Sequence, residues 1–380
     1  MRSPRTSDST RLRRAHRKVA AQQPASRAAT FIETVLLPPW LFTCAGATPV
    51  PLKVFRDDIN CLGGDGPLGA VCGNKARKLA AFAEAASNTS MKVERLVSHG
   101  GAQSNAMLAL AGFSSALGVR FQYVTRPLPR WLRERPCGNL KRALSLGMEL
   151  WECRTFTEYQ STVSELEQEY QRQSEQIGYP QKLFVPQGVA CPEAAVGLRR
   201  LAESIAAEDL RDIRMVCVPA GTGTTAWYLQ QYLPANVQVL AVACVGDSQY
   251  LKAQFRRLEA RTHAASRGTA VSLRRSVQVL PNESGGFGTL KSELYRLWRA
   301  LPSYFDLIYA PPTLLALSAY FADAPERLRD VLYVATGGSE GNATQLRRYQ
   351  RKFGQQLESI CLDASSMMPV RGTARRSLIR

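Results

Sequence analysis

The stretch MVCVPAGTGTTAWYL (215–229) joins an apolar run of strand character to a helical pattern through a turn rich in glycine and threonine. The apolar run covers 215–220, the glycines stand at 221 and 223, and the helical pattern begins at 225. Backbone N–H groups of such a loop converge on an anion, with the helix N-terminus behind them. The loop lacks the Gly-Lys pair of nucleoside-triphosphate loops, so it predicts a phosphate site without nucleotide hydrolysis.

Strand and helix signals alternate on both sides of this segment, from about residue 50 onward. Such alternation predicts an α/β architecture with parallel sheets and right-handed crossovers. Ligand sites in these sheets gather where strands end and helices begin. The expected strands are 52–56, 95–99, 120–125, 183–187, 215–220, 237–245 and 332–336. The expected helices are 75–86, 104–117, 161–177, 192–206, 225–233, 251–261, 290–301 and 340–353.

Three further loops place small or polar residues just before a helix: GNKARKL (73–79), SHGGAQSN (98–105) and ATGGSEGN (335–342). Lys75 stands in the positive field of a helix start, which favours its neutral amine, and a neutral amine can form a Schiff base. A basic first turn exposed to solvent explains this loop equally well. Ser104 or Asn105 could serve as an N-cap, although two glycines beside a hydroxyl and an amide exceed what a cap requires.

The phosphate loop also fits the pattern G-x-G-x-x-A, from Gly221 to Ala226, and Asp247 ends the following strand. In a dinucleotide-binding fold, an acid at that place binds the ribose. An NAD-dependent dehydrogenase is therefore an alternative function.

The composition predicts a folded protein of two domains. The chain has 380 residues, of which 45% are hydrophobic and 21% charged, and a domain usually takes about 100–200 residues. Three histidines give little material for a metal site, and we expect no metal. Nine cysteines, odd in number and never arranged as CxxC, predict no disulfide framework and no zinc finger, and they favour a reducing, cytoplasmic location.

The net charge of +18 belongs largely to the two ends of the chain. Residues 1–30 carry eight Lys or Arg against Asp8 alone, and 365–380 carry four Arg and no acid, which leaves +7 for the rest (18 − 7 − 4). We therefore expect basic disordered tails at 1–31 and 365–380, and no specific nucleic-acid partner. The N-terminal segment also has the Ser-rich, acid-poor composition of transit peptides, so an organelle is the alternative location.

Membrane association is not expected. The uncharged stretch 215–246 is long enough to cross a bilayer. Its glycines, prolines and polar residues would leave unsatisfied groups in lipid, whereas a buried strand–loop–helix–strand unit uses all of them.

Taken in order, the motifs resemble a known enzyme family. GNKARKL, GGAQSN, AGTGTT, Tyr309 and a final TGG resemble the pyridoxal-phosphate enzymes of the 1-aminocyclopropane-1-carboxylate deaminase and D-cysteine desulfhydrase family, from about Leu52 to Asn342. The resemblance implies the tryptophan synthase β-like fold (fold type II), with two three-layer α/β domains and mostly parallel, twisted sheets. The large cofactor-binding domain would comprise 32–78 and 193–364, and the small domain 79–192. The resemblance also implies a homodimer.

The resemblance implies roles for individual side chains around pyridoxal 5′-phosphate. Lys75 would be the Schiff-base lysine, and Asn105 would bond the phenolic oxygen of the cofactor. Ser104 would face the substrate carboxylate or assist proton movement. Tyr309 would be the active-site tyrosine, and Thr336 would meet the pyridine nitrogen. The phosphate would lie on Gly221, Thr222, Gly223, Thr224 and Thr225.

Charged residues precede the lysine loop, at Arg56, Asp57 and Asp58. Charges beside a cofactor loop are costly unless they are paired. We expect Asp57 or Asp58 to pair with Arg77 or Lys78, so that the loop is held at the mouth of the site.

Four alanine or phenylalanine positions depart from the family pattern. Ala106 stands where His is common, and Ala335 replaces the His of HTGG. Ala310 stands where deaminases carry Glu and desulfhydrases Thr, and Phe287 stands where Tyr is usual. These changes remove polar groups from around substrate and cofactor.

The departures bear on the expected reaction. Opening the cyclopropane ring leans on polar groups that this chain lacks, so the resemblance favours β-elimination on a small amino acid, with D-cysteine as the leading substrate. The products would be a 2-oxo acid and ammonia. Ring-opening deamination is one alternative, and racemisation, which needs only proton transfer between Lys75 and Ser104, is another.

Overall fold

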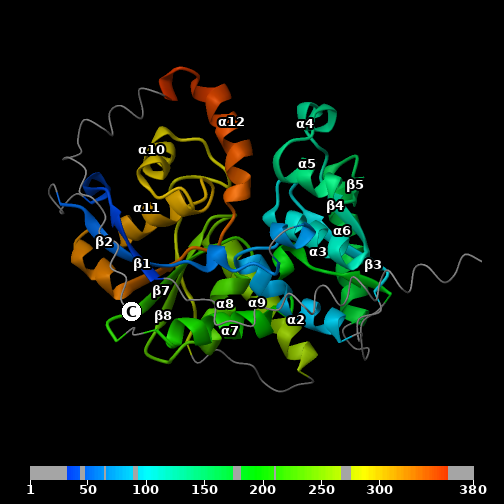
Figure 1. The fold of residues 1–380 in the computed structure, drawn as a ribbon, viewed down its shortest axis with the longest axis horizontal. Helices are drawn as coiled ribbons and strands as arrows, with labels where there is room; N and C mark the ends of the chain where they lie inside the picture. Colours follow the sequence, from blue (N-terminus) through cyan, green and yellow to red (C-terminus); the bar gives the residue numbers. More distant parts are fainter. Residues whose placement is uncertain are drawn as a thin grey trace, which may run out of the picture.

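The computed structural model describes residues 32–42, 48–63, 66–88, 93–173, 181–208, 211–266 and 275–357. Two lobes lie side by side, each built on its own sheet (Figure 1). The basic tails expected at the two ends lie outside the described residues. Among the described residues, no helix combines the length and the apolar composition that a membrane crossing requires.

The larger lobe is built on a six-stranded sheet in the order β1-β2-β10-β7-β8-β9. Neighbouring strands are parallel except β1, which pairs antiparallel with β2. The central strand β7 is buried at all six positions, as a strand covered on both faces must be. The strands are β1 (Ile32–Leu37), β2 (Val50–Phe55), β7 (Met215–Ala220), β8 (Gln238–Ala243), β9 (Gln278–Leu280) and β10 (Val331–Val334).

Helices cover both faces of this sheet. On one face, α7 (Ala194–Ala206), α8 (Thr224–Tyr232) and α9 (Ser248–Ala265) share one apolar core with alternate strand residues. On the other face, α10 (Ser292–Ala300) and α11 (Ala310–Tyr320) share a second core. The last helix, α12 (Asn342–Phe353), lies on the side of this lobe that faces the smaller one (Figure 1).

The smaller lobe has a four-stranded sheet in the order β5-β4-β3-β6, with every neighbouring pair parallel. A single apolar core joins the sheet to its helices. The strands are β3 (Arg95–Gly100), β4 (Arg120–Thr125), β5 (Met148–Glu152) and β6 (Lys182–Phe184). The helices are α3 (Asn105–Leu117), α4 (Arg130–Glu134), α5 (Gly138–Ser145) and α6 (Phe156–Gln173).

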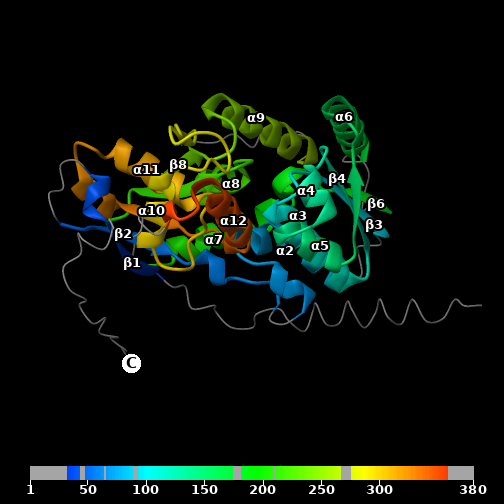
Figure 2. The same cartoon turned by 90° about the horizontal axis from the view of Figure 1, so that it is seen from above.

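Helix α2 (Asn74–Ser87) connects the two lobes, as the view from above also shows (Figure 2). Its Leu79 and Phe82 belong to the core of the smaller lobe. Its other side packs on α7 so closely that a Cβ at Gly197 would collide with Arg77 O. The start of α2, which carries the lysine loop, is therefore fixed between the two lobes.

The predicted strands and the parallel architecture are confirmed, but three strands were not predicted. These are β1, β5 and β9, and each lies at an edge of its sheet. An edge strand is covered less completely than a central one, so its sequence need not be a continuous apolar run. The pattern MELWE of β5 mixes apolar and acidic residues and includes the exposed Trp151. Helix α6 begins five residues earlier than expected, at Phe156.

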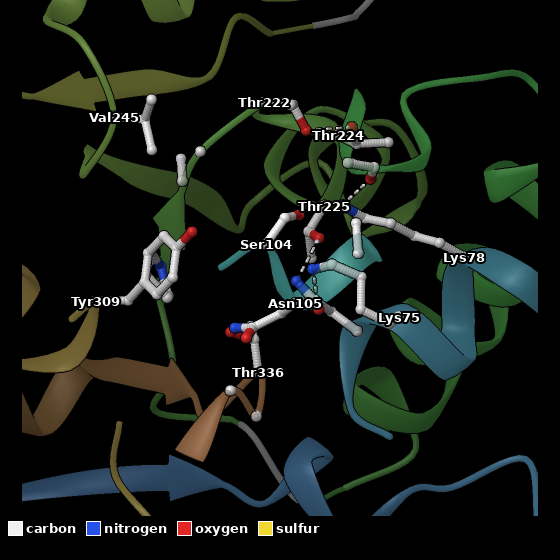
Figure 3. Close-up of a pocket in the computed structure, with 18 of the residues that line it drawn as sticks. Lys75, Lys78, Ser104, Asn105, Thr222, Thr224, Thr225, Val245, Tyr309 and Thr336 are labelled. Atoms are coloured by element: carbon white, nitrogen blue, oxygen red, sulfur yellow. Dashed lines mark hydrogen bonds between the residues drawn. The ribbon is translucent and has the colours of Figure 1, made fainter. Parts of the chain in front are cut away.

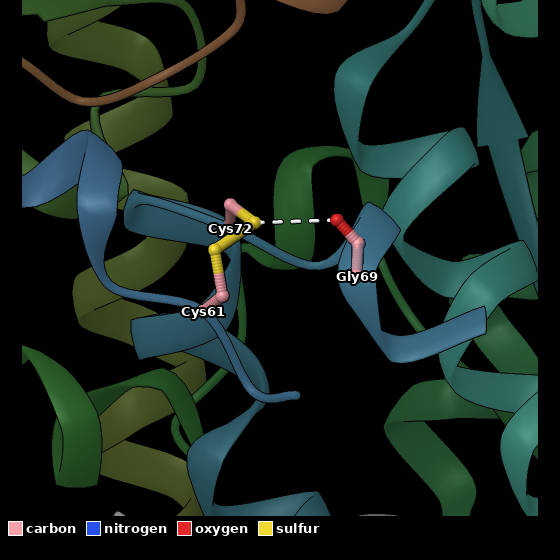
Figure 4. The surroundings of a disulfide bond; sticks show 3 residues. All are labelled: Cys61, Gly69 and Cys72. Atoms are coloured by element: carbon pink, nitrogen blue, oxygen red, sulfur yellow. Dashed lines mark hydrogen bonds between the residues drawn. A yellow bond between two sulfur atoms is a disulfide. The ribbon is translucent and has the colours of Figure 1, made fainter. Parts of the chain in front are cut away.

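The expectation of no disulfide is wrong for one pair. Cys61 and Cys72 form a disulfide, shown in Figure 4, across an isolated antiparallel bridge whose Cα atoms lie 4.0 Å apart. The bridge folds the chain back just before the lysine loop, which the spacing of the cysteines alone does not reveal. Cys44 and Cys361 lie outside the described residues. The other described cysteines, Cys137, Cys153, Cys191, Cys217 and Cys244, are free.

Candidate active site

One cavity collects the loops singled out from the sequence. It lies at the carboxyl ends of β3, β7, β8 and β10 and at the starts of α2, α3 and α8, where parallel α/β sheets place their ligands (Figure 3). Every predicted site residue lines it: Lys75, Ser104, Asn105, Gly221, Thr222, Gly223, Thr224, Thr225, Tyr309 and Thr336.

Lys75 is held inside the cavity and is not a solvent-exposed first turn. Its Nζ donates a hydrogen bond to Asn74 Oδ1 at 2.8 Å. Burial lowers the pKa of Lys75 to about 8, against the opposing charges of Glu340 and Asp306. Gly73 precedes the helix with φ of 61°, and a Cβ there would collide with Thr336 O. Only glycine lets the start of α2 come this close to the end of β10.

Lys78 is a site residue that the sequence analysis missed. Its side chain is 3% exposed, lines the cavity and donates from Nζ to Gly188 O at 3.1 Å. Burial holds the pKa of Lys78 well below its usual range, and the charge of Lys75 lowers it further. The signal was present in GNKARKL, because residues three apart on a helix share a face.

The acidic residues before the lysine loop pair as expected, except that Lys78 takes no part. Arg77 Nε donates to Asp57 Oδ1 at 2.9 Å, and Asp57 is buried. Arg56 binds Asp58 through two hydrogen bonds of 2.7 and 2.9 Å. Arg77 thus fixes the lysine loop through Asp57, whereas the neighbouring Lys78 faces the cavity.

The loop from Gly221 to Thr225 forms an anion cradle at the N-terminus of α8. Gly223 has φ of 72°, and a Cβ there would collide with Phe255 and lie 2.8 Å from Leu251 Cδ1. The hydroxyls of Thr222 and Thr224 lie 3.0 Å apart. Backbone N–H groups and hydroxyls at a helix N-terminus bind phosphate well.

A buried lysine, Lys78, flanks this cradle. A Cβ at Gly188 would lie 2.7 Å from Thr222 Oγ1, so the Gly188 carbonyl that accepts from Lys78 belongs to a segment packed on the loop. The cavity therefore combines a phosphate cradle, a lysine beside it and a second lysine with a lowered pKa. This set can bind an aldehyde and a phosphate carried by one molecule.

Ser104 is the N-cap of α3, as the plainer interpretation predicted: its Oγ accepts from Met107 N at 3.3 Å. The Ser104 hydroxyl is also hydrogen-bonded to the phenol of Tyr123. Asn105 follows in the first turn, and its Oδ1 accepts from Asn139 Nδ2 at 2.7 Å. That bond leaves the NH2 group of Asn105 as the donor available to a ligand.

Asn139, at the start of α5, is a second residue that the sequence analysis missed. It is completely buried and also donates to Gln103 O at 3.1 Å, while its backbone N donates to Gln103 Oε1 at 3.0 Å. Thr344 of α12 donates to the same Gln103 oxygen at 3.3 Å. Asn139 thus holds the Asn105 loop within the smaller lobe, and Thr344 ties the same loop to the larger lobe. No local motif marks it.

Tyr309 closes one side of the cavity and is held by Asp306. Asp306 Oδ1 accepts from the backbone N of Ile308 at 2.9 Å and of Tyr309 at 2.5 Å. Burial raises the pKa of Asp306 to about 6, and burial also raises the pKa of the Tyr309 phenol. The ring of Phe287, 52% exposed, lies 5.6 Å from the ring of Tyr309.

The remaining departures are apolar positions in the structure. Ala310, the first residue of α11, is completely buried, and Ala335 is buried in the same apolar core. Ala106 lines the cavity but brings no polar group. Thr336 is buried at the end of β10, and its carbonyl accepts from Asn74 N at 3.1 Å.

Asp247, the residue that supported a dehydrogenase, has another role. It is exposed and caps α9, where its Oδ1 accepts from Tyr250 N at 2.7 Å. The residue does not line the cavity. A ribose-binding acid would face the ligand, so the structure gives the dehydrogenase interpretation no support at this position.

No protein-family model and no curated protein matches this sequence. Solved structures do match the fold. An "ACC deaminase homologue" is 20% identical, with a TM-score of 0.63 over 91% of this chain and 99% of that one. A fungal L-serine ammonia-lyase from Rhizomucor miehei is 17% identical, with a TM-score of 0.53 over 86% of this chain and 98% of that one.

A third match is a hydrogen sulfide-producing enzyme from Fusobacterium nucleatum, 11% identical, with a TM-score of 0.51 over 82% of this chain and 94% of that one. At such identities the likeness concerns the fold. The chain has the tryptophan synthase β-like fold, with α/β lobes and mostly parallel sheets.

Proposed function

We propose that this protein is an enzyme that binds pyridoxal 5′-phosphate through Lys75 and catalyses β-elimination on a small amino acid. The products are a 2-oxo acid and ammonia, and D-cysteine is the leading substrate. One observation carries the proposal: an amine with a pKa of about 8 shares a cavity with a threonine-rich anion cradle and a second buried lysine.

The donor set fits this cofactor. Lys75 supplies the amine for its aldehyde, and the cradle at the start of α8 supplies backbone and hydroxyl donors for its phosphate. Lys78 adds a positive charge beside the phosphate. Asn105 offers its NH2 group to the phenolic oxygen, and Thr336 offers a hydroxyl to the pyridine nitrogen. When bound, pyridoxal phosphate supplies an electron sink that stabilises negative charge at the substrate Cα.

The other steps fall to the side chains of the chain itself. Lys75, once released from the cofactor, is an amine whose lowered pKa suits it to take the proton from Cα near neutral pH. Ser104 sits at the N-terminus of α3, where a carboxylate is favoured, so it orients the substrate carboxylate. Tyr309 lines the cavity, where its ring limits the size of the substrate, and Phe287 packs on that ring from outside the lining.

The names of the structural matches agree with this chemistry. One match produces hydrogen sulfide and another is an L-serine ammonia-lyase. Because another match is named as an ACC deaminase homologue, ring-opening deamination is the alternative reaction. That reaction is less well supported here, because Ala310 is sealed in the core and Phe287 carries no hydroxyl.

The reaction is tested by incubating the purified protein with D-cysteine, L-cysteine, D-serine and 1-aminocyclopropane-1-carboxylate. Sulfide, ammonia and 2-oxo acid are then measured. We expect sulfide and pyruvate from D-cysteine, and Lys75→Ala should abolish both. Release of 2-oxobutyrate from the cyclopropane substrate, with no sulfide from D-cysteine, would assign the chain to ring opening instead.

A further inference from the structure

Among the described residues that line the cavity, Glu340 is the one carboxylate. It lies in the short 3-10 turn η6 (Ser339–Gly341), which follows β10 and the two glycines of the TGG motif. The other charged lining residues are Lys75 and Lys78, which the proposed function assigns to the aldehyde and the phosphate. The carboxylate of Glu340 has no such assignment.

The turn that carries Glu340 is fixed in place. Gly341 N donates to Gly338 O at 3.1 Å, and Gly338 has φ of 109°. A Cβ at Gly338 would lie 2.7 Å from Asn105 Nδ2, and a Cβ at Gly341 would lie 3.2 Å from Ile308 Cδ1. The turn is therefore packed between the Asn105 loop and the segment before Tyr309, and it brings the charge of Glu340 close enough to act on Lys75.

The carboxylate has no partner of its own. Its side chain forms no ion pair and no hydrogen bond with the rest of the described chain, although it is partly buried. Its charge acts on Lys75, whose pKa it helps to raise against burial. When Lys75 is bonded to the cofactor, its amine cannot pair with Glu340, and the Lys78 amine is hydrogen-bonded to Gly188 O. The described lining then holds no other basic side chain that could neutralise the Glu340 carboxylate.

A partly buried carboxylate without a partner favours a ligand that brings a positive charge. The α-carboxylate of the substrate belongs at the N-terminus of α3, where the helix field is positive. Glu340 adds a negative charge to the same cavity, opposite in sign to the field of that helix N-terminus. It repels acidic side chains and attracts an ammonium group at the far end of a short side chain.

We propose that Glu340 binds a second amino group on the substrate, so that the enzyme accepts a small diamino acid such as 2,3-diaminopropionate in addition to D-cysteine. This inference rests on the proposed β-elimination. The proton at Cα is removed, the Cβ–N bond breaks, and its electron pair leaves with ammonia. Water then releases the second amine. One diaminopropionate and one water give one pyruvate and two ammonia, with no oxidant or reductant.

The test compares the wild-type holoenzyme with Glu340→Gln, which keeps the size and removes the charge. Both enantiomers of 2,3-diaminopropionate, serine and cysteine are assayed for kcat/KM, and binding is followed by the change in cofactor absorbance. A charge-assisted hydrogen bond contributes enough to change affinity about 10- to 100-fold. We expect that loss for diaminopropionate only, with serine and cysteine changed less than about 3-fold. Glu293→Gln, exposed on α10, is the matched control.

Three results would count against the inference. A wild-type enzyme that turns over serine or cysteine but does not turn over diaminopropionate would overturn it while leaving β-elimination intact. An equal loss for all substrates in Glu340→Gln, together with a shifted cofactor spectrum, would assign Glu340 to the cofactor. A wild-type protein that takes up no pyridoxal phosphate would refute the proposed function itself, and this inference with it.

Discussion

Replacing Lys78 by methionine separates binding of the phosphate from binding of the aldehyde. Met keeps the length and the apolar stem of the lysine but removes the positive charge. Lys78 is 3% exposed and its only described hydrogen bond is to Gly188 O, at 3.1 Å. Its ammonium is therefore available to a phosphate bound on the adjacent Thr222 loop.

The magnitude follows from the chemistry of the contact. A hydrogen bond to a charged group contributes about 1.5–3 kcal/mol, which corresponds to a Kd for pyridoxal phosphate that is about 10- to 150-fold weaker in Lys78→Met. In the cofactor-free protein the effects oppose each other. Removing a buried amine relieves its desolvation, while the Gly188 carbonyl loses its donor, so the free energy of unfolding should change by less than about 1 kcal/mol.

The assay titrates cofactor-free protein with pyridoxal phosphate and, separately, with pyridoxal, which has the same aldehyde and no phosphate. Absorbance of the bound cofactor reports both. Lys78→Met should weaken pyridoxal phosphate alone. Lys252→Met, exposed on α9, should change neither ligand. An equal loss for pyridoxal and pyridoxal phosphate would refute the assignment of Lys78 to the phosphate.

Three further predictions follow from the fold and the site. Because the neutral amine is the reactive form, pyridoxal phosphate uptake by Lys75 should rise through pH about 8 and then level off; a rate that keeps rising to pH 10, as with N-acetyl-lysine, would contradict this. Gly223→Ala, which forces an added methyl group into α9 at φ of 72°, should lower the free energy of unfolding by about 2–4 kcal/mol. Gly286→Ala, which has open space, should cost less than about 1 kcal/mol in the same denaturant titration, and equal losses would count against the reasoning. Cys61→Ser should lower the free energy of unfolding by about 3 kcal/mol, because the disulfide to Cys72 closes a short loop in the unfolded chain. Reducing the wild-type protein with dithiothreitol should have the same effect, and an unchanged denaturation midpoint after reduction would contradict this prediction.

The sequence was sufficient for the interior of the fold and for the loops that end its strands. Central strands such as β7 are buried on both faces, so their apolar runs are unmistakable. The edge strand β5 carries a mixed pattern that the same reasoning overlooks. Lys75 could be found because its loop precedes the other motifs in the order of the family pattern, whereas the loop alone fitted an exposed basic turn equally well.

Other site residues depend on contacts between distant segments. Asn139 donates a hydrogen bond to Asn105, 34 positions earlier in the chain, and no sequence motif around Asn139 predicts that contact. Lys78 was considered only as an alternative to Arg77 for the ion pair with Asp57 or Asp58, and its contact with Gly188 lies 110 positions along the chain. The disulfide of Cys61 and Cys72 likewise follows from a chain reversal between them.

The central claim is that Lys75 carries the cofactor. The most direct measurement treats the purified protein, loaded with pyridoxal phosphate, with borohydride and maps the reduced adduct by mass spectrometry. The cavity predicts a single phosphopyridoxyl group on Lys75, with loss of the visible absorbance, and no such adduct in Lys75→Ala. A modified Lys78 with an unmodified Lys75, or a protein that takes up no pyridoxal phosphate at all, would contradict the account.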